Sequence, residues 1–171
     1  MKKTRLVELK VRLALSFLLI FCMENIQAQE SRTLDSLKLE LKSAKEDTNK
    51  VDLLYRISRS YILGDVSKQV PYIDDMLELS IKLNYYRGIG RAYCSYADHY
   101  LRVNYPEKAL PYLRKADSLC QDGKYDAGIP VVNNLFGIYY KGKGDYERAL
   151  LKYQKALSYY KKTGKEKHQA I

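Results

Sequence analysis

The sequence predicts an all-α protein, an α-solenoid in which antiparallel helix pairs pack one after another. Three observations predict this class. Large, small and aromatic residues recur in the same order at an offset of 40 residues. Apolar residues fall three or four positions apart, which is typical of helices, and glycine, asparagine or proline separates the apolar segments. Repetition at such a period is typical of repeat proteins, because one unit cannot bury its apolar face alone.

The first 28 residues are predicted to be a secretory signal peptide. A basic leader precedes an apolar run over residues 13–23, and residues 26–28 resemble a cleavage site. The run is shorter than the ~20 residues that cross a bilayer. An uncleaved anchor and a buried helix are the alternatives. Lipidation at Cys22 is disfavoured because the bulky Phe21 precedes it.

Cleavage after Ala28 would leave 143 of the 171 residues, which is enough for one domain with an apolar core. The net charge would fall from +10 to +7, because the leader carries five basic and two acidic residues. Most basic residues alternate with acidic ones, which indicates a solvated helical surface rather than a nucleic-acid site. The densest basic cluster is Lys161, Lys162, Lys165 and Lys167. It predicts a polar linker or, as an alternative, an attraction for anionic partners or a membrane surface.

Residues 29–49 are predicted to form a polar N-terminal segment followed by a helix. The helix is expected over about 34–46, where Leu34, Leu37 and Leu41 share one face. Residues 47–49, Asp-Thr-Asn, supply the turn and the N-cap of the next helix.

That next helix carries Leu54 and Ile57 on one face and is broken by residues 64–65, Gly-Asp. A third helical pattern follows from Val70 to Leu83. The connector after it is predicted over residues 84–88.

Four more helices are expected at about 88–102, 106–121, 127–141 and 146–162. Pro106 suits the first position of its helix, because the N–H group there has no partner to lose. Pro71 and Pro111 lie about five residues into their helices, so a kink or a loosened first turn is predicted at each.

The repeated pattern resembles the tetratricopeptide repeat (TPR), a helix-turn-helix unit with fixed small and aromatic positions. The best copy matches at Gly137, Tyr140, Gly144, Ala149, Tyr153 and Ala156, although Asn133 replaces a bulky residue. A second copy matches at Ala97, Tyr100, Asn104, Ala109, Leu113 and Ala116. A weaker copy covers residues 54–76, where Gln69 stands in place of alanine. Small residues at these positions let two helices approach to about 8 Å.

The resemblance implies three repeats over about 50–88, 89–126 and 127–163, with residues 164–171 beginning an incomplete fourth repeat or a polar tail. Such repeats form a protein-binding scaffold. The chain is also similar to exported repeat regions of Bacteroidetes signalling proteins, which often precede a histidine kinase or a DNA-binding domain. The alternative is therefore the N-terminal sensory region of a truncated signal-transduction protein. Sequence beyond Ile171 would distinguish the two.

The resemblance further implies that a partner binds in a concave groove lined by the first helix of each pair. The groove positions carried over are Tyr55, Arg59, Arg91, Cys94, Asp98, Arg102, Asn134, Ile138 and Lys141. The three arginines and the lysine could hold a carboxylate or an acidic peptide through charge-assisted hydrogen bonds. The alternative is that each is an ordinary solvent-exposed helix residue.

Cys94 and Cys120 are predicted to be unpaired, with Cys120 partly buried. Cys94 maps to the groove and Cys120 to the end of a second helix, and a disulfide needs Cα atoms within about 7 Å.

The sequence predicts no enzyme, no cofactor, no metal site and no nucleic-acid partner. Its two histidines, His99 and His168, are far apart, and residues 88–90 lack the strand and third glycine of a phosphate loop. The predicted function is an exported, periplasmic or extracellular, protein-binding module. Its partner is a protein or peptide, which could be acidic, and a homodimer could form through an uncapped last repeat.

Overall fold

The computed structural model describes residues 33–164, and within this range the chain is all-α, without a strand. The predictions for the signal peptide (1–28) and for residues 165–171 lie outside the described residues. The chain divides into two compact units, Met1–Lys42 and Ser43–Ile171. In the first unit residues 33–42 are helical, and this helix ends at Ser43, three residues before the predicted end. No helix between residues 33 and 164 is long and apolar enough to cross a membrane.

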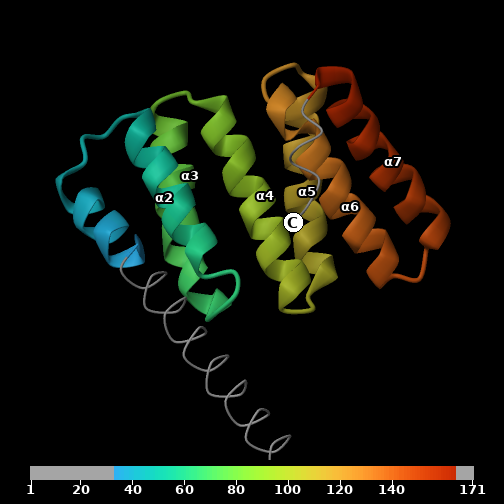
Figure 1. Ribbon diagram of the computed structural model, residues 1–171, viewed down its shortest axis with the longest axis horizontal. Helices are drawn as coiled ribbons and strands as arrows, with labels where there is room; N and C mark the ends of the chain where they lie inside the picture. Colours follow the sequence, from blue (N-terminus) through green and yellow to red (C-terminus); the bar gives the residue numbers. More distant parts are fainter. Residues whose placement is uncertain (1–32, 165–171) are drawn as a thin grey trace, which may run out of the picture. The chain divides into compact units, whose positions relative to one another are not determined.

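The second unit contains six α-helices and two short 3-10 helices, labelled as in Figure 1. They are α2 (Thr48–Ser60), η1 (Val66–Gln69), α3 (Val70–Lys82), α4 (Tyr86–Arg102), α5 (Pro106–Gln121), η2 (Asp126–Gly128), α6 (Ile129–Gly142) and α7 (Tyr146–Thr163).

Caps and left-handed residues set the helix boundaries. Asp47 caps α2 as predicted, because its Oδ1 accepts hydrogen bonds from the backbone N–H groups of Asn49 (2.8 Å) and Lys50 (3.1 Å). Asn104 and Gly144 lie just beyond the first helices of two pairs with φ of 61° and 75°. Asparagine and glycine tolerate this conformation best, which explains why Asn104 can replace the turn glycine of the repeat.

The prolines affect how two of the helices begin. Pro71 lies in the first turn of α3, and the preceding residues form η1, so the predicted loosened first turn is confirmed there. The helix predicted from residue 127 instead begins as η2, and its α-helical part starts at Ile129 with Pro130 in the first turn. Pro111 lies inside α5, which continues through it. The start of α4 is also earlier than predicted, because this helix begins at Tyr86, within the expected connector.

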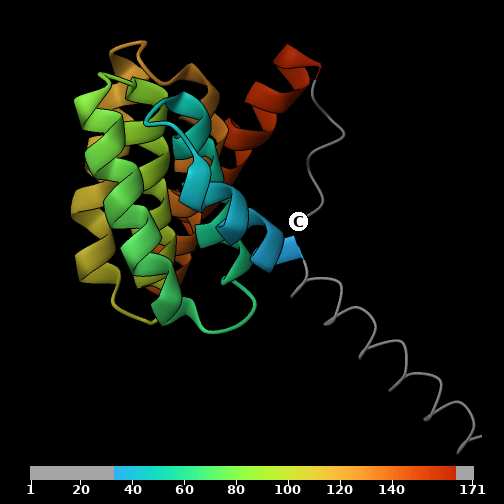
Figure 2. The same cartoon turned by 90° about the vertical axis from the view of Figure 1, so that its left-hand side faces the viewer.

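The helices pack as consecutive antiparallel pairs, α2 with α3, α4 with α5, and α6 with α7. They follow one another in chain order across the second unit (Figure 1). The pairs are joined by contacts of α3 with α4 and of α5 with α6, and the first helices also contact one another, α2 with α4 and α4 with α6. Figure 2 views the row from the α2–α3 end, with α7 (red) inclined to the nearer helices.

One apolar core crosses the boundary between the second and third pairs. Its buried members are Cys94, Ala97, Ala109, Leu113, Ala116, Tyr125, Val132, Leu135, Phe136 and Tyr139. Ala97, Ala109 and Ala116 are completely buried, as predicted for positions where two helices approach closely. Because α4, α5 and α6 all contribute to this core, the two pairs are held together by shared burial.

A larger side chain at one of these alanines should force the helices apart. We expect Ala116→Leu to lower the free energy of unfolding by about 1–3 kcal/mol, because overpacking a filled core displaces its neighbours. Ser118→Leu, at an exposed position on the same helix, should change it by less than about 0.5 kcal/mol. Urea titration followed by circular dichroism measures both. Equal effects at the two positions would contradict the close packing at Ala116.

Candidate functional site

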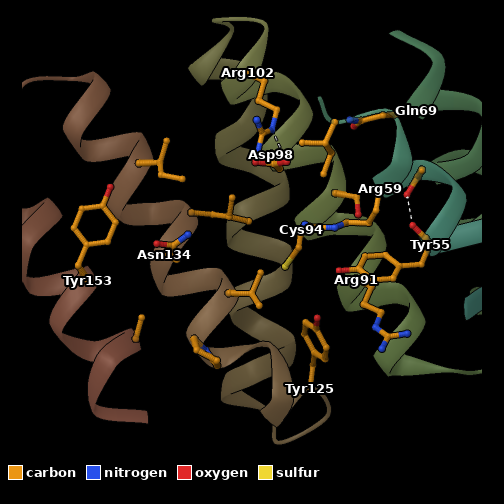
Figure 3. Close-up of a pocket in the computed structure, with 18 of the residues that line it drawn as sticks. Tyr55, Arg59, Gln69, Arg91, Cys94, Asp98, Arg102, Tyr125, Asn134 and Tyr153 are labelled. Atoms are coloured by element: carbon orange, nitrogen blue, oxygen red, sulfur yellow. Dashed lines mark hydrogen bonds and ion pairs between the residues drawn. The ribbon is translucent and has the colours of Figure 1, made fainter. Parts of the chain in front are cut away.

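A groove of about 610 Å³ lies over the first helices of the three pairs. Side chains of α2, α4 and α6 line it, together with Gln69 of η1, Tyr125, and one face of α7. Figure 3 shows Tyr55, Arg59, Arg91 and Gln69 on one side of the groove and Asn134 and Tyr153 on the other.

The structure brings together all but one of the residues predicted for the groove. Those that line it are Tyr55, Arg59, Arg91, Cys94, Asp98, Arg102, Asn134 and Ile138. Lys141 does not, and this placement was wrong. It is exposed in the last turn of α6, beyond the part of that helix that faces the groove.

Sequence reasoning missed the wall formed by α7. Tyr153, Ala156 and Leu157 line the groove, yet the prediction restricted the wall to first helices. The 40-residue offset equates Tyr153 and Ala156 with Leu113 and Ala116 of α5, both of which are completely buried in the core shared with α6. In α7 the equivalent residues line the groove instead, with Ala156 buried and Tyr153 half-buried.

The arginines of the groove differ in how they are paired. Arg102 Nε lies 2.8 Å from Asp98 Oδ2, one helical turn away. Arg91 pairs with Asp52 and lies over the ring of Tyr55, with its guanidinium carbon 4.8 Å from the ring centroid. Arg59 is exposed and forms no ion pair with any residue between 33 and 164. Among the described residues that line the groove, Arg59 is therefore the cation that an added anion could neutralise without breaking an existing pair.

Gln69 is a buried polar residue at the edge of the groove. Its side chain is 2% exposed, and its Nε2 has no hydrogen-bond partner among the described residues. A buried donor without an acceptor costs free energy, so most such groups are paired. Gln69 was noted from the sequence only because it replaces the alanine of the repeat. This replacement was the one sign in the sequence that a polar residue would be buried here.

Tyr125 closes the floor of the groove. A Cβ atom added at Gly90 or at Gly128 would overlap its ring, so glycine at both positions makes room for this side chain. Burial raises the pKa of the Tyr125 phenol, which therefore stays neutral. Glycine also positions the opposite wall, since a Cβ atom at Gly137 would overlap the ring of Tyr153.

Both described cysteines are free, as predicted. Cys94 is buried in the floor of the groove, and burial raises the pKa of its thiol. Cys120 Sγ donates a hydrogen bond to the carbonyl oxygen of Tyr125 at 3.2 Å, and burial raises the pKa of Cys120 to about 11. Both thiols are therefore held in the unreactive protonated form.

The described residues contain no group of three or more His, Cys, Asp or Glu side chains that could hold a metal ion. His99 is buried outside the groove, and its Nδ1 has no described partner. His168 lies outside the described residues. The lining of the groove includes hydrogen-bond donors, guanidinium groups and apolar side chains.

Comparison of the chain with family models, with curated proteins and with solved structures found no match. What the groove binds is therefore inferred from its own residues.

The raised thiol pKa values give a test of the groove floor. We expect Cys94 and Cys120 of the folded protein to react with a chromogenic disulfide reagent at pH 8 roughly 100-fold more slowly than a free cysteine, whose pKa is about 8.5. The rates should rise with pH, because thiolate forms only as the pH approaches the raised pKa values. In urea both thiols should react at once without prior reduction. Fast reaction in the folded state, or a thiol that appears only after reduction, would contradict this description.

Proposed function

We propose that the protein is an exported binding module whose TPR-like helix pairs form an α-solenoid and hold a segment of a partner protein in the groove. The observation that carries the proposal is the contrast between packing and groove positions across the three pairs. Equivalent packing positions keep their small size, as at Ala97 and Gly137, or at Ala116 and Ala156. Equivalent groove positions differ in chemistry.

Two sets of groove positions illustrate this contrast. Tyr55, Cys94 and Asn134 occupy one position of successive first helices, and Arg59, Asp98 and Ile138 occupy the position one turn later. All six line the groove. When equivalent helices stack with a different side chain at each step, each helix can contact a different chemical group along a partner segment.

Export is supported by the signal-peptide layout of residues 1–28. The first residue of the protein recovered outside the cytoplasm decides this point. Gln29 supports export with cleavage, whereas a retained Met1 on protein confined to the cytoplasm contradicts it.

The second candidate is the sensory region of a signal-transduction protein of the histidine kinase or transcriptional regulator type. It is favoured by two exposed apolar residues of α7, Leu150 (57% exposed) and Leu151 (53% exposed). A further helix pair or a second copy of the chain would cover such residues. A gene that continues beyond Ile171 into a membrane helix and kinase motifs would support this candidate.

Filling the groove should weaken binding. Peptides selected from a random phage-displayed library on the immobilised protein are expected to bind at least about 10-fold more weakly to Asn134→Trp, a loss of about 1.4 kcal/mol. The added indole occupies the space between the walls. Ser118→Trp, on an exposed face outside the groove, is the matched control and should bind as the unmodified protein does. The proposed function would be contradicted if the selected peptides bound Asn134→Trp as tightly as the unmodified protein, or if no peptide could be selected.

A further inference from the structure

We infer that the occupant of the groove is an amphipathic helix of a partner protein, with its acidic side against α2 and α4 and its apolar side against α6 and α7. This inference rests on the proposed peptide-binding function and specifies the class of ligand.

The wall formed by α2 and α4 is polar and mainly basic. Arg59 comes from α2, and Arg91, Asp98 and Arg102 come from α4. Three guanidinium groups and one carboxylate belong to this lining. Arg102 is paired with that carboxylate, and Arg91 with Asp52 outside the lining. Arg59 therefore carries the charge left without an ion pair among the described residues. Figure 3 shows Gln69 on the same side as Arg59. Arg59 has no ion pair and the Gln69 amide has no acceptor among residues 33–164, and both groups favour carboxylate oxygens on the ligand.

The opposite wall is mainly apolar, with Asn134 as an exposed polar residue on it. Val131 and Ile138 of α6 are 39% and 38% exposed, and Leu157 of α7 is 39% exposed. All three line the groove, and Leu135 and Tyr160 lie between or beside them. Large apolar side chains that are this exposed on one wall favour an apolar strip on the ligand, because its burial removes their surface from water.

The two walls together favour a helix over an extended segment. An extended segment would turn half of its backbone N–H and C=O groups toward this wall, where Val131, Ile138 and Leu157 cannot form hydrogen bonds. The Asn134 amide could pair with only one or two of those groups. A helix pairs its own backbone groups and presents two chemistries on opposite faces. The groove follows α4 from Arg91 to Arg102, a distance of about 16 Å at 1.5 Å per residue, which matches three turns of a bound helix.

Three synthetic peptides with blocked termini test the inference on the chain from Gln29 to Ile171. The first is a helical peptide with leucine on one face and glutamate on the other. The second has lysine in place of every glutamate. The third has the composition of the first in an order that destroys the amphipathic pattern. Affinities are measured by isothermal titration calorimetry at low and at moderate salt.

Four variants accompany the peptides as two matched pairs. Arg59→Glu is compared with Arg56→Glu, an exposed position of the same helix outside the groove. Leu157→Asp is compared with Leu150→Asp, an exposed leucine of α7 that does not line the groove. Because all four positions are exposed, each variant should unfold at a similar temperature to the unmodified protein.

The acidic amphipathic peptide should bind at least 10-fold more tightly than either other peptide, and added salt should weaken its binding. Arg59→Glu and Leu157→Asp should each weaken it at least 10-fold, and the two matched controls should not. Arg59→Glu should also reduce the ratio of the affinity for the glutamate peptide to the affinity for the lysine peptide.

The inference would be overturned if the second or the third peptide bound as tightly as the first. It would also be overturned if the control variants Arg56→Glu and Leu150→Asp weakened binding as much as Arg59→Glu and Leu157→Asp do. Absence of binding by the acidic amphipathic peptide would overturn it too. The proposed function fails separately, because it depends on the selected peptides and on Asn134→Trp. Selected peptides that occupy the groove without an acidic amphipathic pattern would leave the proposed function standing and the inference refuted.

Discussion

The close approach of neighbouring helices at alanine and glycine is the constraint on which the rest of the structure depends. Ala97, Ala109 and Ala116 are completely buried where α4 and α5 meet, and glycine at position 137 leaves room for the ring of Tyr153. Larger residues at these points would separate the helices and leave apolar surface in water. The spacing of the helix pairs, and with it the width of the groove, follows from the small size of these residues.

Residues that pack and residues that line the groove are interleaved on the same helices, so the fold and the site are coupled. On α4 the core takes Ala97, the groove takes Asp98, and Cys94 belongs to both. Tyr125 serves both, since it belongs to the apolar core and closes the groove floor. The floor of the groove is therefore built from core residues, and Arg59, Arg102 and Leu157 are exposed contacts on its walls.

The local pattern was enough to predict most of the fold. Helix periodicity, the Asp47 cap and the turn residues gave the helix bounds to within a few residues, because they act over one or two turns. The α7 wall and the burial of Gln69 were not predictable in the same way, because they depend on which faces are left uncovered after the pairs have packed. Lys141 was misplaced for a related reason, since helical spacing does not tell where a groove ends along its helix.

Native-state hydrogen exchange on Phe136→Ala tests most directly whether the helix pairs depend on one another. Phe136 belongs to α6 but lies in the core with Ala97 and Leu113 of the preceding pair. Its removal should cost about 3–5 kcal/mol. We predict that amide protection falls in α4 and α5 as well as in α6 and α7. A loss of protection confined to α6 and α7 would show that each pair is stable alone, and it would contradict the account of a groove maintained by shared burial.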